Sequence, residues 1–516
     1  DLRMSRGLGD VYKRQLHGRR RDFRSGKKKN MEKKDLKPAG VFHYFEEICQ
    51  VPRPSKKEEK IIAYLKAFGE QHKLETKVDE TGNVLIKKPA TPGMENRKTV
   101  VLQSHIDMVC EKNNDVEHDF LTDPIETEID GEWLKAKGTT LGADNGIGVA
   151  TELAILADNS IKHGPIECLF TVDEETGLTG AFALKEGFMN GDILLNLDSE
   201  DEGELFIGCA GGIDSVAEFS YKEVDVPAGY FFCKVQVKGL KGGHSGGDIH
   251  LGRGNANKLL NRFLSQTFKK YDMYLCEIDG GNLRNALARE AHAIIAIPEA
   301  DKHSIRTDLN ILASEIEAEY AVVEPDLQFI LESETPRPKA IDKDTTQCLL
   351  QSIYASPHGV YAMSQDIPGL VETSTNLASV KMKPGNIIRI ETSQRSSIES
   401  SKQDIANMVR TVFEMGNAQV SFGDGYPGWK PNPHSEILEI ATASYKRLFG
   451  IDAKVKAIHA GLECGLFLDK YPTLDMISFG PTLQGVHSPD ERMLIPTVDK
   501  FWKHLLDILK NIPVKK

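Results

Sequence analysis

The stretch TVDEETGLTGAFALKEGFMNGDILLNLD, Thr171 to Asp198, joins the ends of two predicted strands. The apolar segment IECLF leads into this stretch, and the adjacent carboxylates Glu174 and Glu175 follow it, just before a turn with a glycine. A second apolar segment, DILLNL, closes the stretch and ends at Asp198. Ligands of open α/β sheets bind beyond the carboxyl ends of the strands. Acids at two such ends therefore predict half of a metal site.

The flanking segments continue the same alternation of strands and helices. KTVVLQSHIDMVC predicts a strand that ends at His105, with Asp107 two residues later. LGADNGIGVATELAILAD predicts a glycine-flanked turn at Asp144 and then an amphipathic helix. Near the C-terminus, TLDMISFGP predicts a buried strand, and QGVHSPDE after it carries His487. We expect an α/β fold, a mixed sheet with helices on both faces.

The middle of the chain predicts a second domain. The segment FFCKVQVKGLKGGHSGGDIHLGRGNANKLL predicts a strand, a glycine-rich loop with His244 and a helix, and further strands and helices follow. GYPGWKPNPHS is typical of a linker. We expect a catalytic domain over residues 31–211 and 428–516, with an α+β lid domain inserted at residues 212–427. No internal repeat is visible in the sequence.

Residues 1–30 differ from the rest because they hold eleven Lys or Arg against three Asp. They lack the apolar core of a secretory signal. One interpretation is a basic targeting or nucleic-acid-binding arm. Charge runs are usually solvated, which favours a disordered or non-native extension before Met31.

Composition excludes several classes of function. The formal net charge of −12 argues against a nucleic-acid partner. No window reaches about 18 consecutive apolar residues, so we expect no membrane span. The eight cysteines are scattered without a CxxC pair, which is typical of a reduced, cytoplasmic chain.

Imidazole and carboxylate ligands at the predicted strand ends suit zinc, with manganese or cobalt as substitutes. The five candidate ligands are His105, Asp144, Glu175, Asp198 and His487. With one bridging carboxylate, most economically Asp144, they can hold two metals about 3.5 to 4 Å apart. Glu174 then stays free as the general base that takes the proton of metal-activated water and returns it to the leaving amine. Asp107 is placed to fix the tautomer of His105.

Each of these residues also has a structural interpretation. A lone histidine is more often a hydrogen-bonding residue than a ligand, and adjacent glutamates often form a solvated strand exit. The turn at Asp144 can be an ordinary helix start, since Asp and Asn favour caps and turns. Because the five candidate ligands occur together at predicted strand ends, we favour the metal site over these structural interpretations.

Six motifs resemble one known family: SHIDMV, LGADNGIGVA, FTVDEETGLTGA, NLDSEDEGE, GVHSPDE and KGLKGGHSGGDIHLGRGNA. They are similar to the bacterial aminoacyl-histidine dipeptidases, which belong to the aminoacylase- and carboxypeptidase-like dinuclear zinc metallopeptidases. The resemblance extends from Met31 to the C-terminus. It implies two zinc ions per chain, with Glu174 as the general base and Asp107 as the acid that orients His105. It assigns His105 and Asp198 to one zinc and Glu175 and His487 to the other. It implies that Asp144 bridges the two zinc ions.

The resemblance also implies roles for three residues of the lid domain. His244 matches a histidine that polarises the scissile carbonyl, whereas Asn285 and Arg395 match positions that contact substrate. A guanidinium suits the terminal carboxylate of a peptide. The structural alternatives are a glycine-rich hinge around His244, a turn residue at Asn285 and an ion pair at Arg395.

We therefore expect a cytoplasmic dipeptidase that cleaves unblocked dipeptides under a closing lid. The resemblance implies a homodimer formed through the lid domain. An N-acyl amino acid deacylase or a tripeptidase is the nearest alternative, because related folds use the same metal core. A non-catalytic peptide-binding protein is a third possibility, although such a protein needs no general base.

Overall fold

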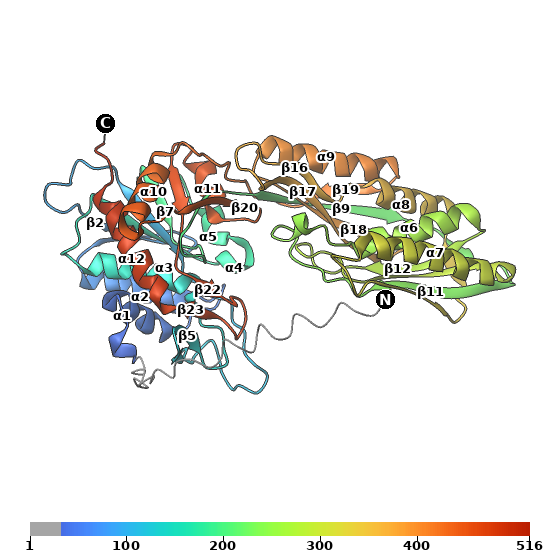
Figure 1. Cartoon of the computed structure of the whole chain (residues 1–516), viewed down its shortest axis with the longest axis horizontal. Helices are drawn as coiled ribbons and strands as arrows, with labels where there is room; N and C mark the ends of the chain where they lie inside the picture. The colour runs from blue at the N-terminus through green and yellow to red at the C-terminus, as the bar shows by residue number, and fades with distance from the viewer. Residues whose placement is uncertain (1–31, 516) are drawn as a thin grey trace, which may run out of the picture.

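The computed structural model describes residues 32–515, so the expectation for residues 1–30 lies outside the described residues. The described chain forms two regions, each built around its own large sheet, side by side along the long axis of the molecule (Figure 1). We call residues 211–422 the lid region and the remainder the first region. Within the described residues, no helix combines the length and the apolar character needed to cross a membrane.

A mixed sheet forms the centre of the first region, as expected. In sheet order its strands are β1 (Glu75–Val78), β2 (Val84–Lys88), β6 (Ile166–Thr171), β3 (Val100–His105), β7 (Ile193–Asn196), β21 (Asp475–Ser478), β8 (Glu204–Cys209) and β20 (Lys454–Ile458). Strands β6, β3 and β7 are parallel neighbours and are buried at every position. Their carboxyl ends therefore meet at one edge of the sheet, where ligands bind in such folds.

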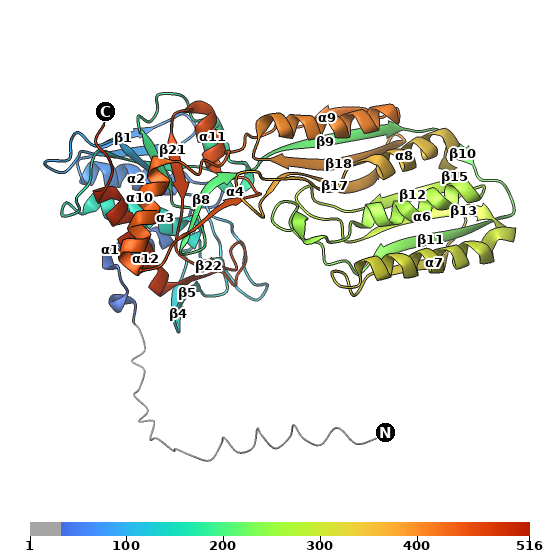
Figure 2. The same ribbon diagram turned by 45° about the horizontal axis from the view of Figure 1, so that its top comes forward.

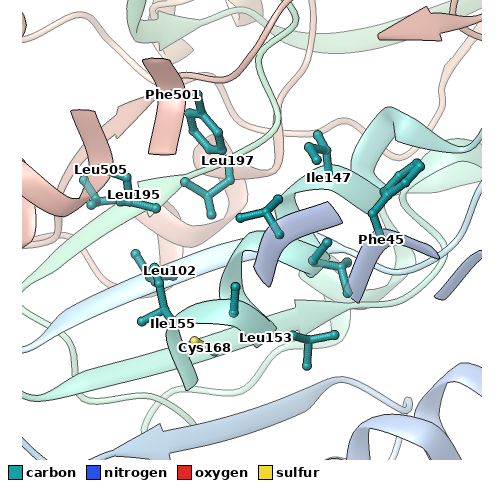
Figure 3. Close-up of a cluster of buried hydrophobic side chains, with 14 of the residues drawn as sticks. Phe45, Leu102, Ile147, Leu153, Ile155, Cys168, Leu195, Leu197, Phe501 and Leu505 are labelled. Atoms are coloured by element: carbon teal, nitrogen blue, oxygen red, sulfur yellow. The ribbon is translucent and has the colours of Figure 1, made fainter. Parts of the chain in front are cut away.

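Helices cover both faces of this sheet. One face carries α1 (Ala39–Cys49), α2 (Glu59–Gln71), α3 (Ala143–Ala157), α10 (Glu436–Phe449) and α12 (Ile495–Lys510), and the other carries α5 (Thr179–Ala183) and α11 (Glu463–Lys470). Strand side chains alternate between the two layers: Leu102 and Leu195 pack with α3 and α12 (Figure 3), whereas Val101 and Leu194 pack on the opposite side. Helix α3 is buried along nearly its whole length, so the expectation of an amphipathic helix there is wrong.

Smaller elements complete the first region. They are the short helices η1 (Lys33–Asp35) and α4 (Glu174–Gly177) and a four-stranded sheet of β22 (Leu483–Gln484), β23 (Arg492–Leu494), β5 (Trp133–Ala136) and β4 (Thr127–Asp130). Strands β22 and β23 form a hairpin, and β23 pairs with β5. This pairing places the hairpin loop that contains His487 beside the segment that leads to Asp144.

The lid region contains two units of the same topology, each running strand, helix, strand, strand, helix, strand. One unit comprises β11 (Tyr230–Lys238), α6 (Ala256–Lys270), β12 (Tyr274–Gly280), β13 (Ala291–Pro298), α7 (Lys302–Tyr320) and β14 (Gln328–Ser333). The other comprises β9 (Gly211–Ser220), α8 (Lys343–Ala355), β17 (Val371–Lys383), β18 (Ile387–Ser396), α9 (Glu399–Met415) and β19 (Gln419–Phe422). In both units the strands lie in the order fourth, first, third, second. The structure thus contains an internal repeat that the sequence does not show.

The two units join edge to edge into one sheet. Their second strands β12 and β17 pair at Asp279 with Lys381, and the Lys381 ammonium lies 2.8 Å from the Asp279 carboxylate. The four long helices pack on one face of the joined sheet (Figure 2). The connecting elements are β10 (Glu223–Asp225), η2 (Ile249–Leu251), η3 (Glu299–Asp301), β15 (Lys339–Ile341) and β16 (Gly359–Met363).

Two chain segments cross between the regions, and they are hydrogen-bonded to each other. Cys209 and Trp429 exchange two backbone hydrogen bonds of 2.9 Å, and Gly212 and Tyr426 exchange another pair of 3.0 and 2.9 Å. A side chain at Gly211 would collide with the opposite backbone, since an added Cβ would lie 2.5 Å from the nitrogen of Gly428. The expected linker is therefore one strand of a paired crossing.

Candidate metal centre

The structure brings the five predicted ligands together at the carboxyl edge of the first sheet. His105 ends β3, Glu175 lies in α4 directly after β6, and Asp198 follows β7. Asp144 comes from the turn that begins α3, and His487 comes from the loop between β22 and β23. Five residues from five separate segments of the chain thus lie close together.

These residues form two overlapping groups that share Asp144. In the first group, Nε2 of His105 lies 3.1 Å from Oδ1 of Asp144 and 3.4 Å from Oδ1 of Asp198. In the second, Nε2 of His487 lies 3.2 Å from Oδ2 of Asp144 and 3.0 Å from Oε2 of Glu175. Each oxygen of Asp144 therefore faces a different histidine, as a carboxylate that bridges two metals requires.

The pKa values of these groups reflect the burial of several carboxylates close together. Burial raises the pKa of Asp198 to about 8. Burial alone would also raise the pKa of Asp144, but hydrogen bonds from His105 and His487 hold it below its usual range. Hydrogen bonds to Asp144 and Glu175 raise the pKa of His487 to about 11. Crowded buried carboxylates of this kind need positive charge close by.

The donor set fits divalent cations. The buried oxygens Oε1 of Glu175 and Oδ1 of Asp198 accept no well-formed hydrogen bond from any described residue. Buried carboxylate oxygens are ordinarily hydrogen-bonded or bound to metal. Imidazole nitrogen and carboxylate oxygen together suit zinc, manganese or cobalt.

Glu174 lies beside these ligands without belonging to either group. Its carboxylate is within 4.8 Å of ligand atoms of His105 and Glu175. Burial, together with the charges of Asp198 and its other acidic neighbours, raises its pKa well above the usual value. A carboxylate with a raised pKa next to a metal site has the properties of a general base.

Asp107 connects the first histidine to the turn that carries both glutamates. Its Oδ1 lies 3.2 Å from Nδ1 of His105 and accepts the backbone N–H of Glu174 at 3.0 Å. Its Oδ2 accepts the N–H of Glu175 at 3.3 Å and the hydroxyl of Ser55 at 2.8 Å. Burial opposes ionisation, yet these bonds lower its pKa to about 2. Asp107 is thus an ionised acceptor that can fix the orientation of His105.

Three buried charged residues at this site were not predicted from the sequence. Glu463, in α11, accepts hydrogen bonds from Gln103 at 2.7 Å and Thr171 at 3.0 Å, and burial raises its pKa to about 7. Glu491 and Arg53 bind the backbone around Asp144. Glu491 lies in the HSPDE motif, which also contains the predicted ligand His487, so the motif pointed to this part of the site. Arg53 and Glu463 lie in segments that contain no such motif.

The three predicted lid residues also lie close together. The N–H of Ser245, next to His244, donates to the carbonyl of Asn285 at 2.7 Å. Arg395 donates from Nε to the hydroxyl of Ser245 at 3.4 Å and from Nη1 to the hydroxyl of Tyr426 at 2.9 Å. Partial burial and the Arg395 charge lower the pKa of His244. The backbone of Asn285 and the side chain of Arg395 therefore both contact Ser245, the neighbour of His244.

The loop of His244 packs against the first region. A Cβ added to Gly246 would lie 2.2 Å from the carbonyl oxygen of His459, which leads into α11. The ring of His459 bonds the hydroxyl of Ser374 in β17 at 2.7 Å. Nδ1 of His244 accepts the N–H groups of Gly246 and Gly247 at 3.2 and 3.1 Å, so the neutral ring carries its proton on Nε2.

Known proteins resemble this chain over most of its length. A model described as Peptidase family M20/M25/M40 matches residues 101–511. A "Cytosol non-specific dipeptidase" of Escherichia coli K12 is 44% identical over 484 residues, which cover 94% of this chain and all of the relative. The crystal structure of an aminoacylhistidine dipeptidase from Vibrio alginolyticus superposes with a TM-score of 0.88 at 46% identity and covers 94% of this chain and 99% of that chain.

A more distant structure shares the fold alone. A tripeptidase from Staphylococcus aureus covers 92% of this chain and 99% of its own, with a TM-score of 0.54 at 17% identity. The family match and the E. coli relative both extend over most of the chain. The chain therefore belongs to Peptidase family M20/M25/M40.

Proposed function

We propose that this protein is a metal-dependent dipeptidase that hydrolyses unblocked dipeptides. The observation that carries the proposal is the pair of ligand groups that share Asp144, with the carboxylate of Glu174 beside them. The similarity to the two dipeptidases named above supports the substrate class. The name of the E. coli relative supports a cytosolic location. The homodimer implied by the resemblance stays a prediction.

We assign two zinc ions to the site, with manganese or cobalt as substitutes. His105 and Asp198 would hold one ion, Glu175 and His487 the other, and Asp144 both. When bound, such a pair supplies Lewis acidity, which makes water nucleophilic near neutral pH and polarises a carbonyl oxygen.

The side chain of Glu174 moves the proton in this proposal. Its carboxylate takes a proton from the attacking water and delivers that proton to the nitrogen of the leaving amine. The high pKa that burial gives Glu174 suits it to hold the proton between these two events. Asp107 acts through His105, whose ring it orients.

In this proposal two lid residues bind the dipeptide, His244 at the carbonyl of the scissile bond and Arg395 at the terminal carboxylate. Nε2–H of His244 can donate to the carbonyl oxygen of the scissile bond, because Nδ1 is already an acceptor. Arg395 would bind the terminal carboxylate of the dipeptide. It bonds Ser245 through Nε and Tyr426 through Nη1, and its Nη2 bonds none of the residues that the structure describes. Asn285 lies beside the loop of His244, because its carbonyl accepts the N–H of Ser245. A fixed distance from metals to Arg395 would select dipeptides by length.

The first test is cleavage of a small panel of unblocked dipeptides, including Ala-His and Gly-Leu, by the zinc-loaded protein. We expect release of free amino acids that stops when a chelator is added and returns when zinc is restored. A tripeptide and an acetylated amino acid in the same panel separate the tripeptidase and deacylase alternatives. A zinc-loaded protein that binds a dipeptide and returns it uncut would contradict the enzymatic proposal.

Glu174→Gln tests the general base. Removing the ionisable group should lower kcat by roughly 10² to 10⁴. Zinc content, measured by elemental analysis, should stay unchanged because Glu174 is not assigned as a ligand. Glu186→Gln, at an exposed position in the same segment, is the control and should leave kcat unchanged. Near-normal turnover of Glu174→Gln would show that another group accepts the proton.

Arg395→Ala tests recognition of the terminal carboxylate. The variant should raise KM for dipeptides strongly, while it should have little effect on the same dipeptides with an amidated C-terminus. The matched control is Arg389→Ala on the same strand, where the arginine pairs with Glu391 at 3.0 Å. An equal loss on free and amidated substrates would exclude a carboxylate-binding role for Arg395.

A further inference from the structure

Glu491 binds four consecutive backbone amides at the start of α3. Its Oε2 accepts the N–H of Leu141 at 2.7 Å and of Gly142 at 2.9 Å. Its Oε1 accepts the N–H of Ala143 at 2.7 Å and of Asp144 at 3.3 Å. Glu491 is 2% exposed, so these bonds are shielded from water. One carboxylate therefore fixes the whole turn that presents Asp144.

Arg53 holds the same turn from its carbonyl side. Its Nη2 donates to the carbonyl of Gly142 at 2.5 Å, and its Nη1 donates to the carbonyls of Ile106 and Asp107 at 3.1 and 3.0 Å. Arg53 is also 2% exposed. Gly142 has a φ of 68°, and a Cβ there would lie 2.6 Å from Nη2 of Arg53, so this position requires glycine. Arg53 thereby ties the turn to the segment that follows His105.

Glu491 and Arg53 connect the two ligand groups through the backbone. Glu491 lies in the same β22–β23 loop as His487, and its N–H donates to the carbonyl of Ser488 at 3.1 Å. The loop that supplies His487 is therefore attached to the turn of Asp144 by Glu491. That turn is attached to the segment of His105 by Arg53.

Asn145 ties the turn to the segment of Asp198 through a 2.8 Å bond to the carbonyl of Leu197, but the first amides of α3 receive no cap from the N-cap residue. The N-cap of α3, Gly142, has no side chain with which to bond the first amides of the helix. Asp144 has the non-helical backbone angles φ −81° and ψ 108°, so the helix does not dictate its direction. A bridging carboxylate must meet two metals with separate oxygens, which requires a fixed orientation.

We propose that Glu491 is a positioning residue, which holds Asp144 in register with His487 so that both metals can share the Asp144 carboxylate. Arg53 supports the same turn against the segment of His105. The proposal rests on the dinuclear site proposed above. A glutamine at position 491 keeps one acceptor oxygen and directs an NH₂ group at the remaining backbone donors, so the turn should lose its fixed position.

The test is zinc affinity, measured by competition with a chromophoric chelator, for wild type and Glu491→Gln. We expect wild type to bind two zinc ions and the variant to lose about 10- to 100-fold in affinity for at least one of them. In protein loaded with two Co²⁺ ions, magnetic coupling between the ions should weaken in the variant, because the bridging carboxylate is displaced.

Glu324→Gln is the matched control. Glu324 is also 2% exposed, and its carboxylate accepts the backbone N–H groups of Lys241 at 2.8 Å and Gly254 at 3.1 Å in the lid region. It should lower the urea midpoint and leave zinc affinity unchanged. Arg53→Lys, in which a single ammonium replaces the fork that bonds three carbonyls, provides a second variant if Glu491→Gln does not fold. We expect it to weaken zinc binding as well.

The possible results distinguish this proposal from the proposed function. Unchanged zinc affinity of Glu491→Gln and Arg53→Lys, with a wild type that binds two zinc ions, would overturn the positioning role alone. Equal losses of affinity in Glu324→Gln and Glu491→Gln would also overturn it, because they would indicate general destabilisation. A wild type that binds no zinc would overturn the metal centre itself.

Discussion

The contact of one carboxylate with two histidines is the constraint on which the rest of this structure depends. Asp144 faces His105 with one oxygen at 3.1 Å and His487 with the other at 3.2 Å, although those histidines are far apart in the sequence. The parallel strands bring His105 to the sheet edge, and the β22–β23 hairpin returns His487 to it. Burial then confines several carboxylates in a space that favours divalent cations.

Contacts between the two regions set the position of the lid region. Paired crossing segments join it to the first region, and the loop of His244 packs on the backbone of His459. Arg395 is buried among residues of both the lid and the crossing, because it bonds Ser245 and Tyr426. The groups proposed to bind substrate are thus fixed by the elements that connect the two regions, so changes at the crossing would alter substrate binding as well as stability.

Much of the site could be predicted because its ligands interrupt a simple pattern. Buried parallel strands are continuous apolar runs, and an acid or histidine directly after such a run marks the carboxyl edge. Arg53 could not be predicted in this way, because its role depends on three carbonyls that only the folded backbone brings together. The repeat in the lid region could not be predicted either. Two units can share a topology if each has the same pattern of apolar residues, and many different sequences supply that pattern.

The arrangement of the metals is the central claim, and anomalous diffraction at the zinc edge from crystals of the zinc-loaded protein tests it directly. The account predicts two peaks about 3.5 to 4 Å apart, with the Asp144 carboxylate between them. One peak should adjoin His105 and Asp198, and the other should adjoin Glu175 and His487. A single peak, or two peaks that do not share Asp144, would contradict the account.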